Sequence, residues 1–442
     1  MSRDTAFEVL RSGSPTPLRL VSRFAERAHL DDRDRGLVRA LVGCEVRRRG
    51  TLRAIVRLFA QGNPSPEVAT ILRLGVAQLC FMDSVPDHAA ISETVRVASD
   101  HISLARGRYV NGVLRSVQRG RVEGHSGDPR QDLVGANWHF PMPIFRDPIE
   151  HPLLWAEDAL SVPSNLFKRW HKRYGMETAS ELGRIALAEP DLSVVCLGDD
   201  REAILGLFPD LVARPGLHDK VALFDSSAAS TLLHSPEFLA GAFTVQGETA
   251  LRAAEAVAAQ PGERILDLCA APGGKTALLA KAGAQVLAAD IAESRLESVK
   301  ATLARLGLDS QVETLVSNGT EAIPADRDPF DAALVDAPCS NTGVLGARAG
   351  ARWRFGPKTQ KELIELQASL LDQASAWVRP GGRLVYSTCS LETDENEQQV
   401  RRFLETHSGW KLDYQQSYLP AAPGSQGPID GGFHARLAHV GG

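Results

Sequence analysis

The sequence predicts a multidomain protein with an all-helical module, a small α/β module and a doubly wound, Rossmann-like α/β domain. Residues 1–122 place apolar side chains at helical spacing and show no strand alternation. From about residue 262, short apolar runs alternate with helical patterns, which is typical of a parallel sheet covered by helices. The 442 residues are enough for two to four domains, and the 43% apolar content is that of a soluble globular protein.

The all-helical module is predicted for residues 1–122. Ser65, Pro66 and Glu67 form a helix start, with a capping hydroxyl, a proline at the first helical position and an early acid. The apolar residues that follow recur at helical spacing: Val68, Ile71, Leu72, Val76 and Leu79. A bundle of about five or six helices fits this length.

The same module is rich in arginine. Residues 1–120 hold 19 Arg, no Lys and 12 acidic residues, a balance of +7, so the overall charge of −5 leaves −12 for the remainder. Arginine suits phosphate contacts and base stacking, and we expect RNA contact from five residues of this module: Arg35, Arg39, Arg47, Arg48 and Arg49. The alternative is a solvated helical surface that binds nothing.

Two segments separate this module from the C-terminal domain. Residues 123–160 lose periodicity and cluster glycine and proline, so we expect a linker. Residues 161–241 mix a helix that starts at Pro163 with a strand over 192–197, which indicates a small α/β module. The remaining residues, 242–442, are expected to form the catalytic domain. Its strands are predicted at 264–268, 285–289, 312–316, 332–335 and 383–386.

A glycine-rich turn, residues 267–276, joins the first of these strands to a helix. Glycines allow close approach of a ligand, and the helix start offers unpaired N–H groups. Asp290 ends the next strand, where an acid can accept ribose hydroxyls. A P-loop would need glycine where this chain has Cys269, and the dinucleotide glycine pattern is absent. S-adenosylmethionine is therefore the predicted cofactor.

Two cysteines follow predicted strands, in the runs Asp336-Ala337-Pro338-Cys339-Ser340 and Ser387-Thr388-Cys389-Ser390. The carboxyl ends of such strands are where ligands bind in doubly wound sheets. A thiolate is a nucleophile, and its addition to C6 of cytosine makes C5 reactive toward a methyl donor. That chemistry needs an attacking thiol, an acid at the base edge and a release group, roles that Cys389, Asp336 and Cys339 can fill. The alternative is two ordinary core cysteines.

These runs resemble the motifs of the Sun/Nop2 group of RNA (cytosine-5)-methyltransferases. The resemblance rests on residues 267–276, 336–344 and 386–396. It implies that Cys389 is the nucleophile, that Cys339 assists product release and that Asp336 touches both the cofactor and the target base. It also implies an S-adenosylmethionine site made of Cys269, Ala270, Ala271, Pro272, Gly273, Gly274, Lys275, Asp290 and Asp336.

The N-terminal module has its own resemblance. Residues 32–35, 71–75, 85–90 and 110–115 are similar to the NusB-like RNA-binding domain fused to bacterial 16S ribosomal RNA (cytosine-5)-methyltransferases. Residues 430–433 resemble the closing motif of that group, whose last strand packs back into the sheet. Residues 161–241 resemble its small, RRM-like RNA-binding module only loosely. The implied substrate is a single-stranded or flipped cytosine of ribosomal RNA, expected to be 16S.

Two departures from the family pattern stand out. Asn318 occupies the place after the third strand where the family usually has an adenine-contacting Asp, and its amide can take that role. Residues 345–353 replace the usual Arg-x-Pro-Asp run, but Arg348, Arg352 and Trp353 remain as candidate RNA contacts. The departures leave two alternatives open: a transfer RNA cytosine-5 methyltransferase, or a non-catalytic RNA-binding assembly factor.

Six scattered cysteines without a CxxC pair favour neither a disulfide framework nor a metal site. We therefore expect a reduced, cytoplasmic compartment. The N-terminus lacks the apolar stretch of a signal peptide, and the sequence has no run of 18 apolar residues, so neither secretion nor a membrane span is expected.

Overall fold

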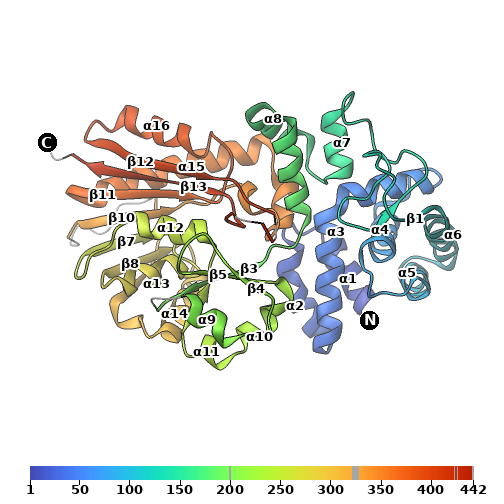
Figure 1. Ribbon diagram of the computed structural model, residues 1–442, viewed down its shortest axis with the longest axis horizontal. Coiled ribbons are helices and arrows are strands. Elements are labelled where there is room, and N and C mark those ends of the chain that lie inside the picture. Colours follow the sequence, from blue (N-terminus) through green and yellow to red (C-terminus); the bar gives the residue numbers. More distant parts are fainter. Residues whose placement is uncertain (199–200, 321–327, 423, 426, 441–442) are drawn as a thin grey trace. The chain divides into compact units, whose positions relative to one another are not determined.

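The structure is a computed structural model that describes residues 1–198, 201–320, 328–422, 424–425 and 427–440 (Figure 1). It contains two compact units. The first comprises residues 1–188 and 345–356, and the second comprises residues 189–344 and 357–442. The segment 345–356, called the inserted segment below, thus belongs to the first unit although residues of the second flank it in the sequence.

Six helices form the N-terminal bundle, as the apolar spacing predicted: α1 (Ser2–Arg11), α2 (Pro17–Arg27), α3 (Asp32–Phe59), α4 (Pro66–Phe81), α5 (Asp87–His101) and α6 (Leu104–Gly120). Side-chain caps define two of the starts. The Asp31 carboxylate accepts from the Asp34 N–H before α3, and the Ser103 hydroxyl accepts from the Arg106 N–H before α6. Pro66 occupies the first position of α4.

The segment expected as a linker is folded within the first unit. It carries β1 (Val122–Glu123), β2 (Trp138–His139) and α7 (Pro152–Ala159). Phe140 is buried with its ring centroid 5.4 Å from that of Phe59. The buried Trp155 donates from Nε1 to the Pro129 carbonyl at 3.1 Å. The glycine and proline content correctly indicated a loss of periodicity, but these aromatic anchors still pack. The next helix, α8 (Ser164–Leu187), also belongs to the first unit rather than to the small module.

The small module of the second unit is a four-stranded antiparallel sheet with the order β4-β5-β3-β6. Its strands are β3 (Leu192–Cys196), β4 (Ala213–Pro215), β5 (Val221–Phe224) and β6 (Phe243–Val245). Its helices are α9 (Arg201–Leu207), α10 (Ala229–Leu233) and α11 (Pro236–Leu239). All four residues of β5 are buried, as expected for an inner strand.

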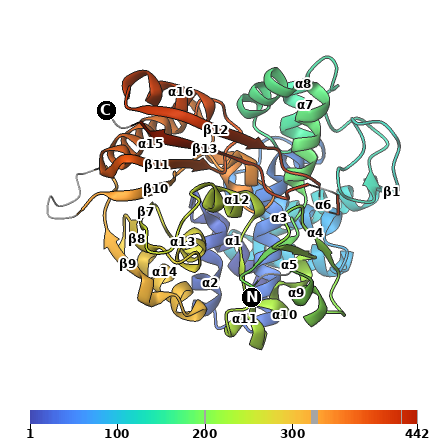
Figure 2. The same ribbon diagram turned by 60° about the vertical axis from the view of Figure 1, so that its left-hand side comes forward.

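The larger sheet has seven strands in the order β12-β13-β11-β10-β7-β8-β9, which Figure 2 shows in turn. The five strands from β11 to β9 are parallel, and β13 and β12 add antiparallel pairs at one edge. The five predicted strands are all present: β7 (Arg264–Leu268), β8 (Gln285–Asp290), β9 (Val312–Val316), β10 (Phe330–Asp336) and β11 (Val378–Thr388). The last strands are β12 (Trp410–Tyr418) and β13 (Gly432–His439), and β13 pairs with β11 as the family resemblance implied.

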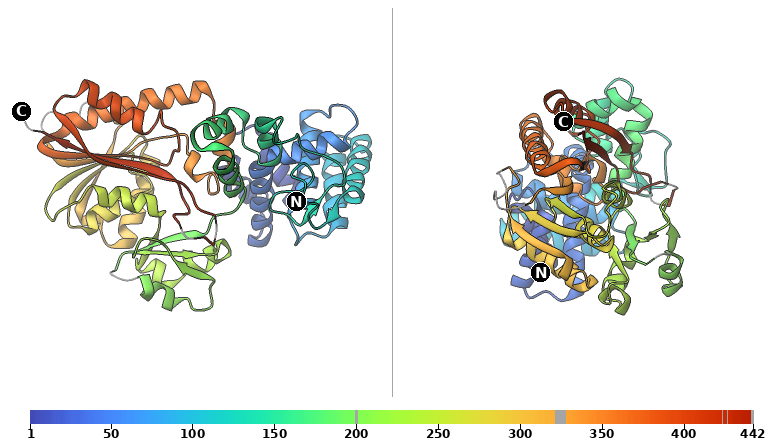
Figure 3. Two further views of the ribbon diagram at one scale, coloured as in Figure 1. Left: turned by 45° about the horizontal axis from the view of Figure 1, so that its top comes forward. Right: turned by 90° about the vertical axis from the view of Figure 1, so that its left-hand side faces the viewer.

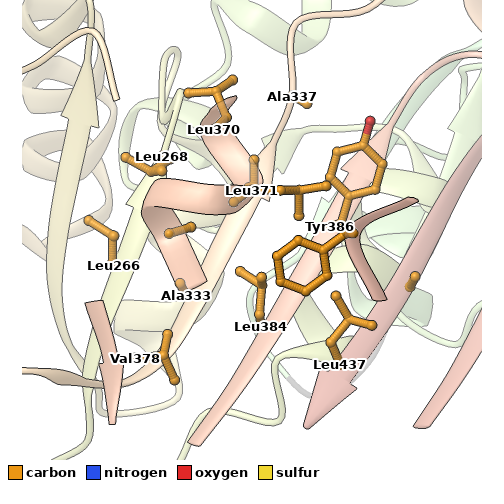
Figure 4. Close-up of a cluster of buried hydrophobic side chains, with 14 of the residues drawn as sticks. Leu266, Leu268, Ala333, Ala337, Leu370, Leu371, Val378, Leu384, Tyr386 and Leu437 are labelled. Atoms are coloured by element: carbon orange, nitrogen blue, oxygen red, sulfur yellow. The ribbon is translucent and has the colours of Figure 1, made fainter. Parts of the chain in front are cut away.

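Helices cover both faces of this sheet (Figure 3). On one face lie α15 (Pro357–Trp377) and α16 (Glu397–Thr406), and on the other lie α12 (Glu248–Ala256), α13 (Gly274–Lys281) and α14 (Glu293–Leu306). Side chains alternate between the two faces along each strand. Figure 4 shows Leu266, Leu384 and Tyr386 packed with Leu371 of α15, whereas Ile265 and Val385 join the opposite core.

Candidate active site

The parallel register brings the ends of β7, β10 and β11 to one edge of the sheet. Leu334 of β10 lies opposite Asp267 of β7, and Asp336 lies opposite Ser387 of β11. The loops that leave these strands carry the glycine-rich turn and both cysteines of the predicted site. The sheet therefore gathers at one edge residues that lie more than a hundred positions apart in the sequence.

The two cysteines lie in contact. The sulfur atoms of Cys339 and Cys389 are 3.2 Å apart, and Cys389 donates from Sγ to the Asn341 side-chain oxygen at 3.3 Å. Cys339 is buried, whereas Cys389 is partly exposed. The hydrogen bond with Cys389, burial and nearby negative charge raise the pKa of the Cys339 thiol well above its ordinary value. Cys389 is thus the more accessible of the two thiols, and the pKa shift opposes loss of a proton from the buried Cys339.

An ion pair lies beside these cysteines. Lys275 donates from Nζ to Asp336 Oδ2 at 2.6 Å, and the Ser387 hydroxyl donates to Asp336 Oδ1 at 3.0 Å. Burial alone lowers the pKa of Lys275, but the charge and hydrogen bond of Asp336 outweigh it and raise that pKa. The site therefore holds a fixed positive charge against a carboxylate that is still about one-third exposed.

The glycine-rich turn has a left-handed backbone at two positions. Cys269 has φ +63° and Gly273, which caps α13, has φ +101°. A Cβ at Gly273 would lie 3.1 Å from Cα of Val299, so a larger residue would crowd α14. The Asp290 carboxylate accepts from the Ala271 N–H at 3.0 Å and ties the turn to the end of β8. Burial and the nearby carboxylates raise the pKa of Cys269 to about 12, which disfavours its thiolate form.

Two buried acceptors beside the turn fit a ligand that carries N–H donors. Asp267 Oδ1 and Gln246 Oε1 have no hydrogen-bond partner among the described residues. A Cβ at Gly274 would lie 2.9 Å from Gln246 Oε1, which places this oxygen at the turn. The other Asp267 oxygen accepts from the Thr276 hydroxyl at 2.6 Å. Unsatisfied acceptors suit the ammonium group of S-adenosylmethionine, so the residues present fit this cofactor.

Comparison with known proteins gives two matches to family models. Residues 254–427 match the model described as 16S rRNA methyltransferase RsmB/F, and residues 2–119 match the NusB family. A probable ribosomal RNA small subunit methyltransferase B of Bacillus subtilis is 31% identical over 87% of this chain and 83% of its own length. The ribosomal RNA small subunit methyltransferase B of Yersinia pestis is 31% identical over 92% of this chain and 91% of its own. The chain belongs to the RsmB/F family of 16S rRNA methyltransferases.

Membership of the RsmB/F family confirms the NusB-like bundle and the methyltransferase fold, and makes S-adenosylmethionine the cofactor. Two solved structures share the fold. PH0851 has a TM-score of 0.74 at 22% identity and covers 99% of this chain and 98% of its own. NSun6 from Pyrococcus horikoshii, solved with SFG, has a TM-score of 0.53 at 20% identity and covers 63% of this chain and 99% of its own.

The other sequence-predicted cofactor residue, Asn318, lies two residues beyond β9 and is exposed. Its side-chain oxygen accepts from the Thr320 N–H at 3.0 Å. Asp290 also has a further contact, because Arg295 donates from Nε to Asp290 Oδ1 at 2.9 Å. Within the described residues no group of three His, Cys, Asp or Glu side chains could hold a metal ion. None of the described helices is long and apolar enough to cross a bilayer.

The predicted RNA-contact arginines fall into two groups in this RsmB/F chain. Arg35, Arg39 and Arg348 are exposed, although Arg35 also donates from Nε to the Leu30 carbonyl at 2.9 Å. Three others are less exposed and are held by contacts within the protein. Arg47 donates to the Gly346 carbonyl at 2.9 Å, and Arg49 pairs with the buried Glu45 at 2.9 Å. Arg48 donates to the Val134 carbonyl at 2.6 Å, and its guanidinium lies 4.3 Å from the ring centroid of Phe81. Burial lowers the pKa of Arg48 to about 10. RNA contact through Arg48 is therefore wrong, because the guanidinium is enclosed by protein.

Arg352 needs the same correction. This residue of the inserted segment is fully buried, and burial lowers its pKa to about 9. Its guanidinium donates to carbonyls from three other parts of the first unit, Ala186 at 2.6 Å, Arg47 at 3.2 Å and Ser161 at 3.3 Å. Trp353 donates from Nε1 to the Val46 carbonyl at 2.7 Å. Arg352 thus anchors the inserted segment and is not available to RNA.

Sequence reasoning missed Gln246 at the cofactor turn and two residues beside the cysteines. Asn341 contacts Cys389 from a left-handed backbone conformation (φ +60°) and donates to the Cys339 carbonyl at 2.6 Å. Glu395 is fully buried between the two cysteine loops. Both residues lie inside the motif runs, but their roles depend on a pairing of loops that spacing does not reveal.

Proposed function

We propose that this chain methylates C5 of a cytosine in 16S ribosomal RNA, with Cys389 forming a covalent bond to C6 of the base. The observation that supports this most directly is the pair of thiols 3.2 Å apart, beside the Lys275–Asp336 ion pair. A transfer that needed no covalent adduct would not need a second thiol at this distance. The thiolate must approach C6 from the face of the ring, which stacking covers in duplex RNA, so the target base must be flipped or single-stranded.

The residues fill distinct roles in this reaction. The Cys389 thiolate adds to C6 and the electron pair moves toward C5, which takes the methyl group. A water molecule then takes the C5 proton, the C–H electron pair forms the C5–C6 double bond again, and the Cys389–C6 bond breaks with its electron pair returning to sulfur. Cys339 assists this release. Asp336, held by Lys275, offers its partly exposed carboxylate to the exocyclic amine of the base.

The cofactor lies against the glycine-rich turn in this proposal. The turn from Cys269 to Lys275, with Asp290 and Asn318 at the next strand ends, holds S-adenosylmethionine, which supplies an electrophilic methyl group. Asp267 Oδ1 and Gln246 Oε1, both buried acceptors at this turn, receive N–H donors of the ligand.

Small-subunit ribosomal RNA is the favoured substrate. The match to the NusB family and the relatives described as small subunit methyltransferase B both support it over transfer RNA. A non-catalytic assembly factor would have no need for two contacting cysteines beside a buried lysine. The exposed arginines Arg35, Arg39 and Arg348 are proposed as phosphate contacts, whose binding weakens as salt rises.

Bisulfite sequencing of RNA from a strain that lacks the gene tests this function. We expect one 5-methylcytosine of 16S ribosomal RNA to disappear, and to return when the wild-type gene is restored but not with Cys389→Ala. Loss of a transfer RNA modification, with 16S RNA unchanged, would select the transfer RNA alternative. Unchanged RNA throughout would contradict the enzyme.

A further inference from the structure

A buried carboxylate joins the two loops that carry the reactive cysteines. Glu395 lies in the loop between β11 and α16 and is 0% exposed. One of its oxygens accepts from the Ser340 N–H at 2.9 Å and from Gln367 Nε2 at 3.1 Å. The other accepts from the Ser390 hydroxyl at 2.9 Å and from the Ser340 hydroxyl. Four donors therefore converge on one side chain, and all four are uncharged.

These donors come from both cysteine runs. Ser340 directly follows Cys339 and Ser390 directly follows Cys389, and the two hydroxyl oxygens are 3.0 Å apart. The carboxylate thus reaches each loop one residue beyond its cysteine. A buried carboxylate has no water to replace a lost donor, so a change in the spacing of the loops would leave it unsatisfied. This requirement fixes the two loops against each other.

Neighbouring contacts hold Glu395 itself in place. Gln367 on α15 also donates from Nε2 to the Pro338 carbonyl at 2.9 Å, so this one amide joins the first cysteine loop and the carboxylate. Tyr386 of β11 donates from its hydroxyl to the Glu395 carbonyl at 2.7 Å. Because the sheet and α15 both fix Glu395, its carboxylate is a rigid support for the loops.

We propose that Glu395 is a positioning residue that sets the distance between Cys339 and Cys389 and favours Cys389 as the reacting thiol. This inference rests on the proposed function for the roles of the two cysteines. The charge of Glu395 contributes because it lies near Cys339 and opposes the loss of a proton there. Cys339 therefore stays a neutral thiol while Cys389 attacks.

Two substitutions separate distance from charge. Glu395→Gln keeps the size of the side chain but removes its charge and points N–H donors at the donors of Ser340 and Gln367. Glu395→Asp keeps the charge but is one methylene too short to reach both loops. We expect both to lower kcat by about 10- to 100-fold, with KM for RNA and cofactor affinity unchanged. Glu405→Gln replaces a carboxylate by a carboxamide at an exposed position of α16, and it is the matched control.

The second readout needs no RNA. Iodoacetamide labelling of the purified full chain, mapped by mass spectrometry, measures which thiol reacts. In the wild type, Glu395→Asp and Glu405→Gln we expect label chiefly on Cys389, and in Glu395→Gln a several-fold rise in the Cys339 share. Ser390→Ala removes one hydrogen-bond donor to Glu395 and keeps the charge of Glu395, so it should lower kcat without changing the distribution of the label between the two cysteines. This variant tests the positioning role if Glu395→Gln does not fold.

The outcomes distinguish this inference from the proposed function. Wild-type kcat together with an unchanged labelling ratio in Glu395→Gln would overturn the role of Glu395. The role of Glu395 would also be overturned if the activity fell only in proportion to the loss of folded protein, or if the loss were explained by a rise in KM alone. A wild-type enzyme that methylates no cytosine would contradict the proposed function, and the labelling ratio would still decide whether Glu395 distinguishes the two thiols.

Discussion

The sulfur atoms of Cys339 and Cys389 lie 3.2 Å apart, although 49 residues separate them in the sequence. Because one thiol must attack and the other must assist release, their substitutions should fail at different steps. Cys389→Ala should abolish methyl transfer and leave cofactor binding intact. In the Cys339→Ala enzyme, Cys389 should form its bond to C6 but should not be released, so a covalent RNA–protein adduct should appear on a denaturing gel. Cys44→Ala, in the helical bundle, should behave as wild type.

The Lys275–Asp336 ion pair gives a second prediction. Lys275→Met leaves the Asp336 carboxylate beside Cys389 without its cation, and a nearby negative charge opposes formation of the thiolate. We expect kcat to fall by about 100-fold, the usual scale for loss of one preorganised charged group. Single-turnover kinetics with saturating cofactor measures this step. Lys281→Met, an exposed lysine on the same helix, should leave it unchanged. An unaltered rate in Lys275→Met would show that the ion pair serves only packing.

The sequence predicted the parallel strands well because β7, β8, β10 and β11 each contain a short run that is buried on both faces, as Ala332–Val335 is; β9 is less buried. It did not predict β12, although Trp410, Leu412 and Tyr414 alternate with polar residues there; of these three, only Trp410 is buried in the structure. Positive charge in the sequence was a weaker guide to RNA contact than burial in the structure. Arg352 looks like a surface cation in the sequence, but three distant carbonyls enclose it. The cysteines were found through their motifs, whereas Glu395 depends on the contact between two loops.

The buried Arg352 predicts a loss of stability. Arg352→Met leaves the carbonyls of Ala186, Arg47 and Ser161 without this donor in a dry interior. We expect the free energy of unfolding of the first unit to fall by about 3 kcal/mol, which urea denaturation can measure. Arg348→Met, an exposed arginine on the same segment, should change it by less than about 0.5 kcal/mol. Equal effects in the two variants would show that Arg352 is not the anchor.

Asp267 predicts a pH dependence of stability. Burial raises the pKa of its carboxyl from 3.8 to about 7 in the folded chain. Between these two values the folded state holds a proton that the unfolded state has released, so the free energy of unfolding falls as pH rises from about 4 to about 7. Asp267→Asn keeps an oxygen for the Thr276 hydroxyl and removes the titration. Relative to the wild type it should therefore gain stability across this window, by at most about 4 kcal/mol. Calorimetry of the cofactor-free protein at pH 5 and pH 8 measures the difference, with the exposed Asp309→Asn as control. A gain of the same size at both pH values would mean that Asp267 does not titrate there, and that its orphaned oxygen alone accounts for the effect.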